Sequence, residues 1–426
     1  MNTSWRIING RIIDPVNAID REGEIFVHNG VIVSSSAALS PEARIIDAAG
    51  CLVVPGLIDM HVHLREPGQE YKEDILSGTL SAASGGFTAV ACMPNTVPVI
   101  DNSAVCTLVK ERSRNASARV YPIGAISTGN KGEKLAEFGD LRDAGAVGVS
   151  DDGLPVRDSQ LMRRALEYAS NFGLAVISHS EEPALAQGVM NEGFVSTRLG
   201  LKGIPDVAES IMIYRDIALA EFTGKRVHIA HVSTEKSVDL IRQAKTRGVP
   251  VTAETAPHFF TLTHEDIGEY DTNFKMNPPL RSEKDRLAII KALQDGTIDA
   301  IATDHAPHSS LEKEIEFAAA AFGIIGLETA VPLTLDLVRQ GLLDELKMVE
   351  LMSVNPARIL GVEGGHLSPG KPADITLINC EEKFIYSIDK IVSRSKNSPF
   401  IDRTLQGRAV LTMMAGKVTH TSFQER

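Results

Sequence analysis

The feature that most limits the fold of this chain is a regular alternation of two kinds of segment between residues 55 and 365. Eight short apolar runs alternate with amphipathic segments of helical periodicity, such as SQLMRRALEYASNFG (159–173). Buried parallel strands that are each followed by a helix are typical of a barrel, because a parallel pair needs a crossover connection. The sequence therefore predicts an α/β fold with a (β/α)8 TIM-type barrel at residues 55–365. The eight runs are GLIDMHVHL (56–64), FTAVACMP (87–94), ARVYPIGAIS (118–127), GAVGVSDD (145–152), LAVISHSEE (174–182), RVHIAHVST (226–234), PVTAETAPH (250–258) and IDAIATDHAPH (298–308).

Both ends of the chain have a different pattern, in which turn residues interrupt short β-rich stretches. The dipeptides Asn9-Gly10 and Asn29-Gly30 are typical of tight hairpins, and MMAGKVTH (413–420) has a similar glycine-containing turn. Because isolated hairpins are marginally stable in water, we expect the two ends to associate rather than to form two separate caps. The sequence predicts one small β-sandwich domain formed by residues 1–54 and 366–426.

Composition and charge restrict the class of protein and its partners. With 43% hydrophobic and 23% charged residues the chain has ordinary globular usage, and its formal net charge is −12. An acidic chain without a basic stripe argues against nucleic acid and anionic membranes as partners. The four cysteines form no C-x-x-C pair, the N-terminus has no signal pattern and no apolar run reaches membrane-spanning length. We therefore expect a cytoplasmic protein with reduced thiols.

Polar residues gather at the carboxyl ends of the predicted strands, which is the face of a barrel where catalytic residues lie. Imidazole and carboxylate ligands without thiolate suit Zn2+ in a catalytic site, and their number exceeds the three protein ligands of one such ion. The pattern therefore predicts two metal ions bridged by a carboxylate, and it disfavours unrelated polar residues in loops. The residues are His61, His63, Asn95, Asp151, Asp152, His179, His231, Asp304, His305 and His308.

Short motifs at these strand ends and in the connections form a specific combination. They are DMHVHLREPG, MPNT, SDDG, SHSEE, IAHVST, KMNPPLR, ATDHAPH and AFGIIGLET. Together they resemble the motifs of dihydroorotases of the bacterial class I type, in the amidohydrolase superfamily, and the resemblance extends from Ile7 to Lys417. It implies a cyclic amide hydrolase that reversibly converts (S)-dihydroorotate to N-carbamoyl-L-aspartate in de novo pyrimidine (UMP) biosynthesis. It also implies two Zn2+ per subunit, a homodimer, and an association with aspartate transcarbamoylase that has to be tested.

The same resemblance implies a role for each matching position. One ion would bind His61, His63 and Asp304, and the other would bind the two later histidines. Asp152, rather than Asp151, would bridge the ions, and Asp304 would also be the catalytic acid–base residue. The implied metal ligands are His61, His63, Asp152, His179, His231 and Asp304. The implied substrate contacts are His63, Arg65, Asn95, Asn277, His308 and the backbone of Phe322 and Gly323.

Arg65 is an unusual neighbour for metal-binding histidines, because a guanidinium is repelled by a divalent cation. Its planar fork matches a carboxylate, and the implied substrate has one on a small ring. We therefore predict that Arg65 binds this carboxylate, and that it points inward with His61 and His63 if the strand continues beyond them. The alternative is a surface ion pair with Glu66 or Glu70.

Other functions on the same barrel are less compatible with the sequence. Hydantoinases and allantoinases typically bridge their metals with a carboxylated lysine, whereas GAVGVSDDGLPV (145–156) contains aspartates and no lysine. A non-catalytic subunit that scaffolds aspartate transcarbamoylase would have lost metal ligands, and none is missing here. One departure from the dihydroorotase pattern is Ala321, where proline usually precedes Phe-Gly. We also predict that residues 305–323 move over bound substrate as a lid.

Overall fold

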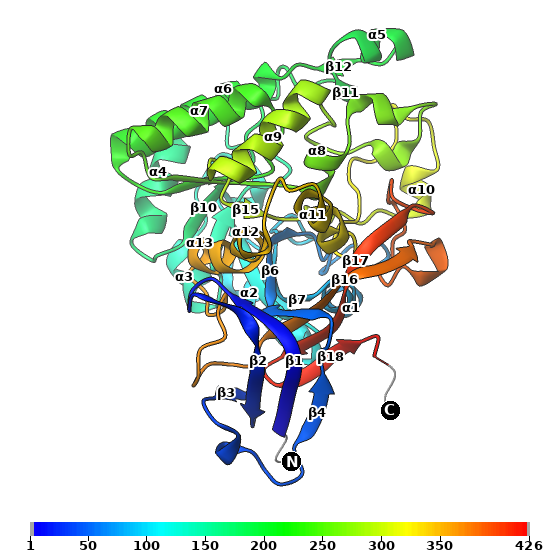
Figure 1. Cartoon of the computed structure of the whole chain (residues 1–426). Coiled ribbons are helices and arrows are strands. Elements are labelled where there is room, and N and C mark those ends of the chain that lie inside the picture. The colour runs from blue at the N-terminus through cyan, green and yellow to red at the C-terminus, as the bar shows by residue number, and fades with distance from the viewer. Residues whose placement is uncertain (1–3, 424–426) are drawn as a thin grey trace.

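The computed structural model describes residues 4–423, which form a parallel barrel beside a mixed sheet (Figure 1). Eight parallel strands pair in the order β6-β7-β8-β9-β10-β13-β14-β15. The barrel closes between β15 and β6, where Val62 bridges His305 and the His63 amide donates to the His305 carbonyl at 2.8 Å. The predicted barrel is confirmed, and each strand lies within one of the eight predicted runs. The strands are β6 (Leu57–Val62), β7 (Phe87–Cys92), β8 (Arg119–Ala125), β9 (Gly148–Ser150), β10 (Ala175–Ser178), β13 (Val227–Ile229), β14 (Val251–Thr255) and β15 (Ala300–Ile301).

Most residues of the barrel strands are buried, and helices cover the strands. Every residue of β6 and β7 is buried, which explains why their sequences are continuous apolar runs. The Asp158 carboxylate accepts from the Leu161 amide and begins α4, and the Thr234 hydroxyl likewise accepts from the Ser237 amide and begins α7. The helices that follow the strands are α1 (Ile75–Ser84), α2 (Ser103–Arg112), α3 (Phe138–Asp143), α4 (Ser159–Ser170), α6 (Val207–Thr223), α7 (Glu235–Thr246), α9 (Glu283–Asp295), α11 (Ala330–Arg339), α12 (Glu345–Val349) and α13 (Asn355–Leu360).

Two connections that follow strand ends are long and contain structure of their own. After β10 the chain forms a two-stranded sheet of β11 (Met190–Asn191) and β12 (Gly203–Ile204), with α5 (Phe194–Leu199) between them. After β14 it forms α8 (Pro257–Thr261) before α9 begins. Figure 1 shows α5, β11 and β12 at the end of the molecule opposite to the strands β1–β4. Within the described residues, none of the helices is long and apolar enough to cross a membrane.

The mixed sheet joins strands from both ends of the chain in the order β18-β17-β16-β5-β1-β2-β3, and β4 pairs with β1. The predicted hairpin at Asn29-Gly30 is confirmed, because it connects β2 to β3. The hairpin predicted at Asn9-Gly10 is wrong. Strand β1 continues through both residues, and Asn9 (φ 62°) lies at a bulge where the register with β2 shifts. The strands are β1 (Ser4–Asp14), β2 (Ile19–His28), β3 (Val31–Val33), β4 (Arg44–Asp47), β5 (Cys51–Pro55), β16 (Ile375–Ile385), β17 (Thr404–Met414) and β18 (Lys417–Thr421).

The segment between β16 and β17 packs on the barrel rather than on the mixed sheet. Tyr386, Ile391 and Phe400 belong to the apolar core that contains the barrel helices. The Glu73 carboxylate, in the connection after β6, accepts hydrogen bonds from the Ser393 hydroxyl and from the next backbone amide. This C-terminal segment therefore reaches the strand-end side of the barrel. The domain limits at 54/55 and 365/366 stay a prediction.

Candidate metal centre and substrate site

Six buried histidine and aspartate side chains form two clusters at the strand ends. The ligand atoms of each cluster lie within 4.8 Å of one another. Asp152 lies between the clusters, because its Oδ1 is 3.3 Å from His61 Nε2 and 3.5 Å from His179 Nδ1. Its Oδ2 is 3.5 Å from His63 Nε2. The clusters are His61, His63 and Asp304, and Asp152, His179 and His231.

Neighbouring side chains orient the histidines of the first cluster. His61 Nδ1 lies 2.7 Å from Glu254 Oε1, and His63 Nδ1 lies 2.9 Å from Asn95 Oδ1. Both rings therefore direct Nε2 towards the aspartates. His61 Nε2 is buried and has no hydrogen-bond partner among the described residues. Such a pattern, with one nitrogen fixed by an acceptor and the other free, is typical of metal-binding histidine.

The charges of the centre favour a cation between the clusters. Burial raises the pKa of Asp152, but His61, His179 and His231 outweigh it and hold that pKa well below its usual value. Burial lowers the pKa of His61, but Asp152 and Asp304 outweigh this effect and raise that pKa well above its usual value. The two carboxylates thus attract positive charge into a buried site, and a divalent metal ion supplies that charge without protons on the imidazoles.

Asp151 faces away from the clusters although it precedes Asp152. Its carboxylate accepts from the Ser127 amide at 2.9 Å and from the Ser127 hydroxyl, at the end of β8. Burial raises the pKa of Asp151 to about 6. The contacts with Ser127 connect the neighbouring strands β8 and β9, and only the second aspartate of SDDG reaches the histidines.

Three residues of the site have left-handed backbone conformations that are uncommon for side chains other than glycine. They are Arg65 (φ 62°), His231 (φ 35°) and Asp304 (φ 49°). Each follows the end of a barrel strand. Such conformations store strain of about 1–3 kcal/mol each and cluster at functional sites, where the surrounding structure compensates for them.

Arg65 is buried, but the route by which it turns inward differs from the prediction. Strand β6 ends at Val62, so the strand does not continue to Arg65, and the backbone turns there instead. The guanidinium Nε donates to the Pro307 carbonyl at 3.1 Å, and Nη2 lies 3.3 Å from His308 Nε2. Burial lowers the pKa of Arg65 to about 10, while Asp304 opposes this, so the group stays cationic at neutral pH.

The alternative surface ion pair for Arg65 is not formed among the described residues. Glu66 accepts from the Ile75 amide at 3.0 Å, and Glu70 accepts from the Gly68 amide at 2.8 Å. The side chain of Arg65 is 8% exposed, whereas a surface pair would leave it in solvent. Its guanidinium therefore faces the strand-end side of the barrel, close enough to Asp152 and Asp304 for both to influence its pKa.

The other predicted substrate contacts surround the same side of the barrel. Asn95 and His308 contact His63 and Arg65, respectively, as described above. Asn277 has a buried Oδ1 without a hydrogen-bond partner in the described part of the chain. The Gly323 amide donates to the Lys275 carbonyl at 3.0 Å, and its own carbonyl accepts from Lys313 and Asn397. The centre of the Phe322 ring lies 4.5 Å from Lys275 Nζ.

Sequence reasoning missed several polar residues of this region. Glu254 lies on β14, and its second oxygen is 3.2 Å from His228 Nε2. His258 follows the same strand and is buried, and burial lowers its pKa to about 4. The available signal for Glu254 was the single acidic residue in the predicted strand run PVTAETAPH (250–258). No signal was available for Lys313, whose partners are all backbone carbonyls of distant residues.

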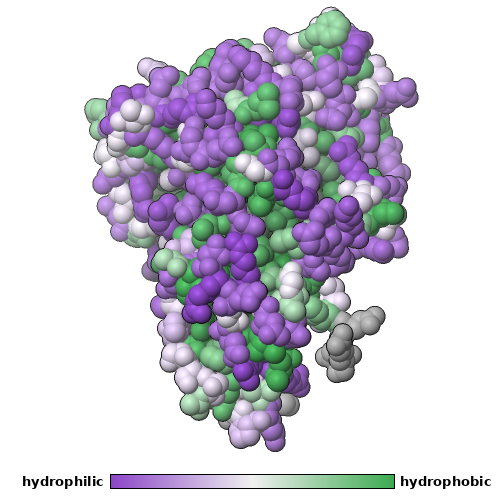
Figure 2. Space-filling model, in the orientation of Figure 1, coloured by the Kyte–Doolittle hydropathy of each residue, from purple (hydrophilic) through white to green (hydrophobic). Residues whose placement is uncertain are grey.

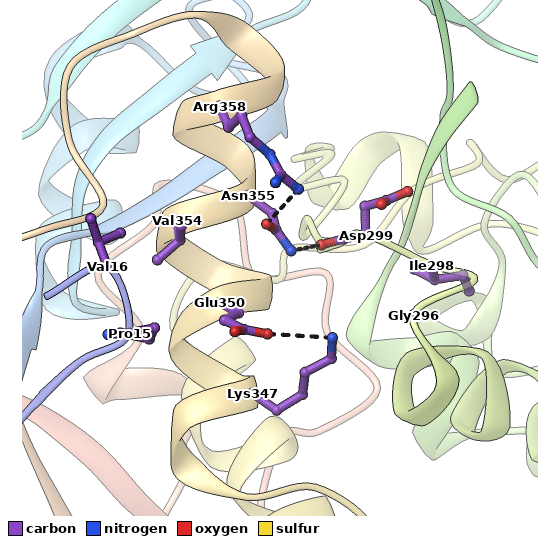
Figure 3. A pocket seen from close by; sticks show the side chains of 10 residues that line it. All are labelled: Pro15, Val16, Gly296, Ile298, Asp299, Lys347, Glu350, Val354, Asn355 and Arg358. Atoms are coloured by element: carbon purple, nitrogen blue, oxygen red, sulfur yellow. Dashed lines mark hydrogen bonds and ion pairs between the residues drawn. The ribbon is translucent and has the colours of Figure 1, made fainter. Parts of the chain in front are cut away.

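A cavity of about 310 Å3 lies at the opposite end of β15 from Asp304 (Figure 3). Its polar groups bond to each other. Asn355 donates to the Asp299 carbonyl at 2.8 Å and accepts from Arg358 at 2.9 Å, while Lys347 pairs with Glu350 at 3.4 Å. We therefore place the functional site at the strand ends and not in this cavity.

The architecture is shared with hydantoinases. The L-hydantoinase (dihydropyrimidinase) from Arthrobacter aurescens matches with a TM-score of 0.88 and 25% sequence identity, over 100% of this chain and 98% of that chain. The dihydropyrimidinase from Brevibacillus agri NCHU1002 matches with a TM-score of 0.86 and 22% sequence identity, over 99% of this chain and 96% of that chain. The site therefore lies in a barrel of the cyclic-amidohydrolase class.

Sequence comparison narrows this class to one family. A family model described as dihydro-orotase-like matches residues 50–237. The dihydroorotase of Desulfotalea psychrophila is 58% identical over 412 residues, which are 96% of this chain and 98% of the relative. The dihydroorotase of Geotalea daltonii is 55% identical over 418 residues, which are 97% of this chain and 98% of the relative. The chain belongs to the dihydroorotase family, as its motifs predicted.

Proposed function

We propose that this protein catalyses the reversible hydrolysis of (S)-dihydroorotate to N-carbamoyl-L-aspartate in de novo UMP biosynthesis, with two Zn2+ per subunit. The observation that supports this most strongly is the position of Asp152 between two buried histidine clusters, next to the buried guanidinium of Arg65. The clusters fit a hydrolytic metal pair, and the guanidinium fits a ring carboxylate. Membership of the dihydroorotase family supports the same substrate.

We assign one ion to His61, His63 and Asp304 and the other to the histidines at 179 and 231, with Asp152 between them. The unpartnered Nε2 of His61 fits a metal ligand, and nitrogen and oxygen donors without thiolate fit Zn2+. When bound, the ions would polarise the ring amide carbonyl and lower the pKa of a water molecule.

We assign the proton transfer of the reaction to Asp304. Its Oδ1 lies 3.1 Å from His63 Nε2 and 3.5 Å from His61 Nε2, at the centre of the first cluster. It would accept the proton of the attacking water and deliver it to the ring nitrogen as the C–N bond of the cyclic amide breaks. The carbonyl carbon becomes a carboxylate, with release of the second proton of the water to solvent, and the nitrogen becomes the terminal NH2 of the carbamoyl group. Ring closure uses the same steps in reverse.

Charged and polar groups around the clusters would orient the ring. Two of the five N–H donors of Arg65 are directed to Pro307 and His308, and the other three, two of them on Nη1, would remain for a carboxylate. Asn95 lies on the same side through its contact with His63. The buried Oδ1 of Asn277 would accept from a ring N–H. We place the backbone of Phe322 and Gly323 on the opposite side of the ring.

A hydantoinase is the alternative function that the shared fold favours. The test is metal analysis together with turnover of dihydroorotate and of hydantoin by the same preparation. We expect two zinc ions per subunit and turnover of dihydroorotate at least about 100-fold more efficient, because hydantoin lacks the carboxylate that Arg65 binds. Faster turnover of hydantoin would overturn the proposed function.

We also propose that the protein is a cytoplasmic homodimer that can associate with aspartate transcarbamoylase. The support is the membership of the chain in the dihydroorotase family. Light scattering of the purified protein, alone and mixed with the transcarbamoylase of the same organism, measures both associations. A mass of one subunit would exclude the homodimer, and unchanged mass in the mixture would exclude the second association.

A further inference from the structure

Lys313 ends α10 (Ser310–Lys313), and its ammonium group points into the protein, with 3% of the residue exposed. It donates to the carbonyls of Lys275, Ala321 and Gly323 at 3.2, 2.9 and 3.1 Å. An ammonium group has three N–H donors, so three carbonyls match it completely. Burying such a charge is costly unless its donors are hydrogen-bonded. The position of Lys313 is therefore fixed by backbone groups rather than by solvent.

Lys275 is buried in the same way and is 2% exposed. Its ammonium group donates to the carbonyls of Phe317 and Ala318 at 2.7 and 3.0 Å, and it lies 4.5 Å from the centre of the Phe322 ring. Its backbone carbonyl accepts from the Gly323 amide at 3.0 Å. Lys275 thus contacts the segment after β15 with both its side chain and its backbone.

The two ammonium groups and these five carbonyls, which we call the lysine clasp, join two connections of the barrel. One connection follows β14 and contains Asn277, two residues after Lys275. The other follows β15 and contains Phe322, between two residues whose carbonyls bind Lys313. The Asn397 side chain adds a further bond to the Gly323 carbonyl at 3.0 Å. The clasp therefore determines the distance between the two sides of the proposed substrate site.

We propose that Lys313 and Lys275 are positioning residues for the reaction, which hold the Phe322–Gly323 backbone against Asn277 and so determine the affinity for dihydroorotate. This inference rests on the proposed function, because that function makes these three residues substrate contacts. Neither lysine touches the substrate. The clasp also limits the predicted lid, because four of its hydrogen bonds join residues 305–323 to Lys275 and would have to break for the segment to open. Lys275 donates to Phe317 and Ala318, and its backbone carbonyl accepts from Lys313 and from the Gly323 amide.

The test compares Lys313→Met and Lys275→Met with wild type, and uses Lys284→Met as the control. Lys284 is exposed and pairs with Glu235 on the helical surface. We expect KM for dihydroorotate to rise about 10- to 100-fold in both clasp variants, because small displacements of positioning groups have effects of this size. kcat should change less than about threefold, since the metal ligands are unaffected. Metal content should equal that of wild type, and the control should be unchanged.

Hydrogen exchange without substrate supplies a second measurement that does not depend on activity. Amides of residues 317–323 should exchange faster in both clasp variants, while the barrel strands keep their protection. Unchanged KM in folded clasp variants would overturn the inference, and so would a fall in kcat and metal content without a rise in KM. Absence of dihydroorotate turnover by wild type would instead overturn the proposed function.

Discussion

The proposed metal centre and the proposed substrate contacts of this protein are built in different ways. The proposed metal ligands lie at the ends of barrel strands, and Glu254 and Asn95 orient the rings of His61 and His63. The proposed substrate contacts Asn277, Phe322 and Gly323 lie in the connections that follow β14 and β15. The lysine clasp binds the carbonyl of Gly323 and those of residues close to the other two. The barrel sheet determines the positions of the residues in the first region, whereas a few side chains determine those in the second region. Changes in the two regions should therefore have different kinetic signatures.

The largest effect on activity is expected for Asp152, which lies between the two clusters of histidine and aspartate side chains. Asp152→Ala should remove metal and lower kcat by on the order of 1,000-fold or more, because the two ions supply several kcal/mol of transition-state stabilisation. Asp151→Ala is the matched control, since Asp151 contacts Ser127 instead of the histidines. Metal content and turnover of both variants measure this. Greater metal loss in Asp151→Ala would place the bridge at Asp151.

A smaller effect is expected for Arg65, the proposed contact of the substrate carboxylate. Arg65→Met removes a charge-assisted contact of roughly 2–3 kcal/mol, which corresponds to about 30- to 150-fold in kcat/KM for dihydroorotate. The kcat/KM for an uncharged cyclic ureide should hardly change in Arg65→Met. Arg65→Lys should recover part of the loss of kcat/KM for dihydroorotate. Metal content should stay, because removal of a nearby cation does not weaken cation binding. Equal losses on both substrates would show that Arg65 only supports the site.

Glu254 tests whether ring orientation matters as much as the ligands themselves. Its carboxylate contacts Nδ1 of His61 and Nε2 of His228. Glu254→Gln keeps the shape and removes the charge, and should reduce metal affinity or kcat by about 10- to 100-fold. Titration of the metal-free protein with zinc, followed by activity, measures both. Wild-type affinity and kcat in this variant would show that the sheet alone orients His61.

The smallest effect is a pH dependence of the lysine clasp. Burial, with a further contribution from the charge of Lys275, lowers the pKa of Lys313 to about 7, and Asp271 opposes the shift. Below that pKa the ammonium group has three N–H donors for three carbonyls, and above it the neutral amine has two. Exchange of the amides of residues 321–323, corrected for intrinsic rates, should rise from pH ~6 to ~8.5 in wild type. The same pH dependence in Lys313→Met would contradict this.

The sequence was sufficient for the barrel and for the grouping of polar residues, because both follow from local patterns. A run such as FTAVACMP reads as a buried strand, and ligands at strand ends must meet once the barrel closes. The distances now bring His61, His63 and Asp304 together, and Asp152 with the histidines at 179 and 231. The metal and the role of each residue stay predictions.

Other features depended on contacts that no local pattern contains. Asn9-Gly10 predicted a hairpin, but the same left-handed residue also suits a bulge inside a long strand. Arg65 was expected to point inward if the strand continued beyond the histidines, whereas β6 ends at Val62 and the backbone turns at Arg65 itself. The partners of Lys313 are carbonyls, which every residue type has, so sequence could not identify the clasp.

Metal content and KM, measured side by side in Asp152→Ala and Lys313→Met, test most directly whether strand ends hold the metals while the clasp holds the substrate. We predict that Asp152→Ala loses metal and nearly all turnover. Lys313→Met should keep both ions and a kcat near that of wild type, with KM for dihydroorotate raised about 10- to 100-fold. Loss of metal in Lys313→Met, or full metal content in Asp152→Ala, would contradict the division between the two regions.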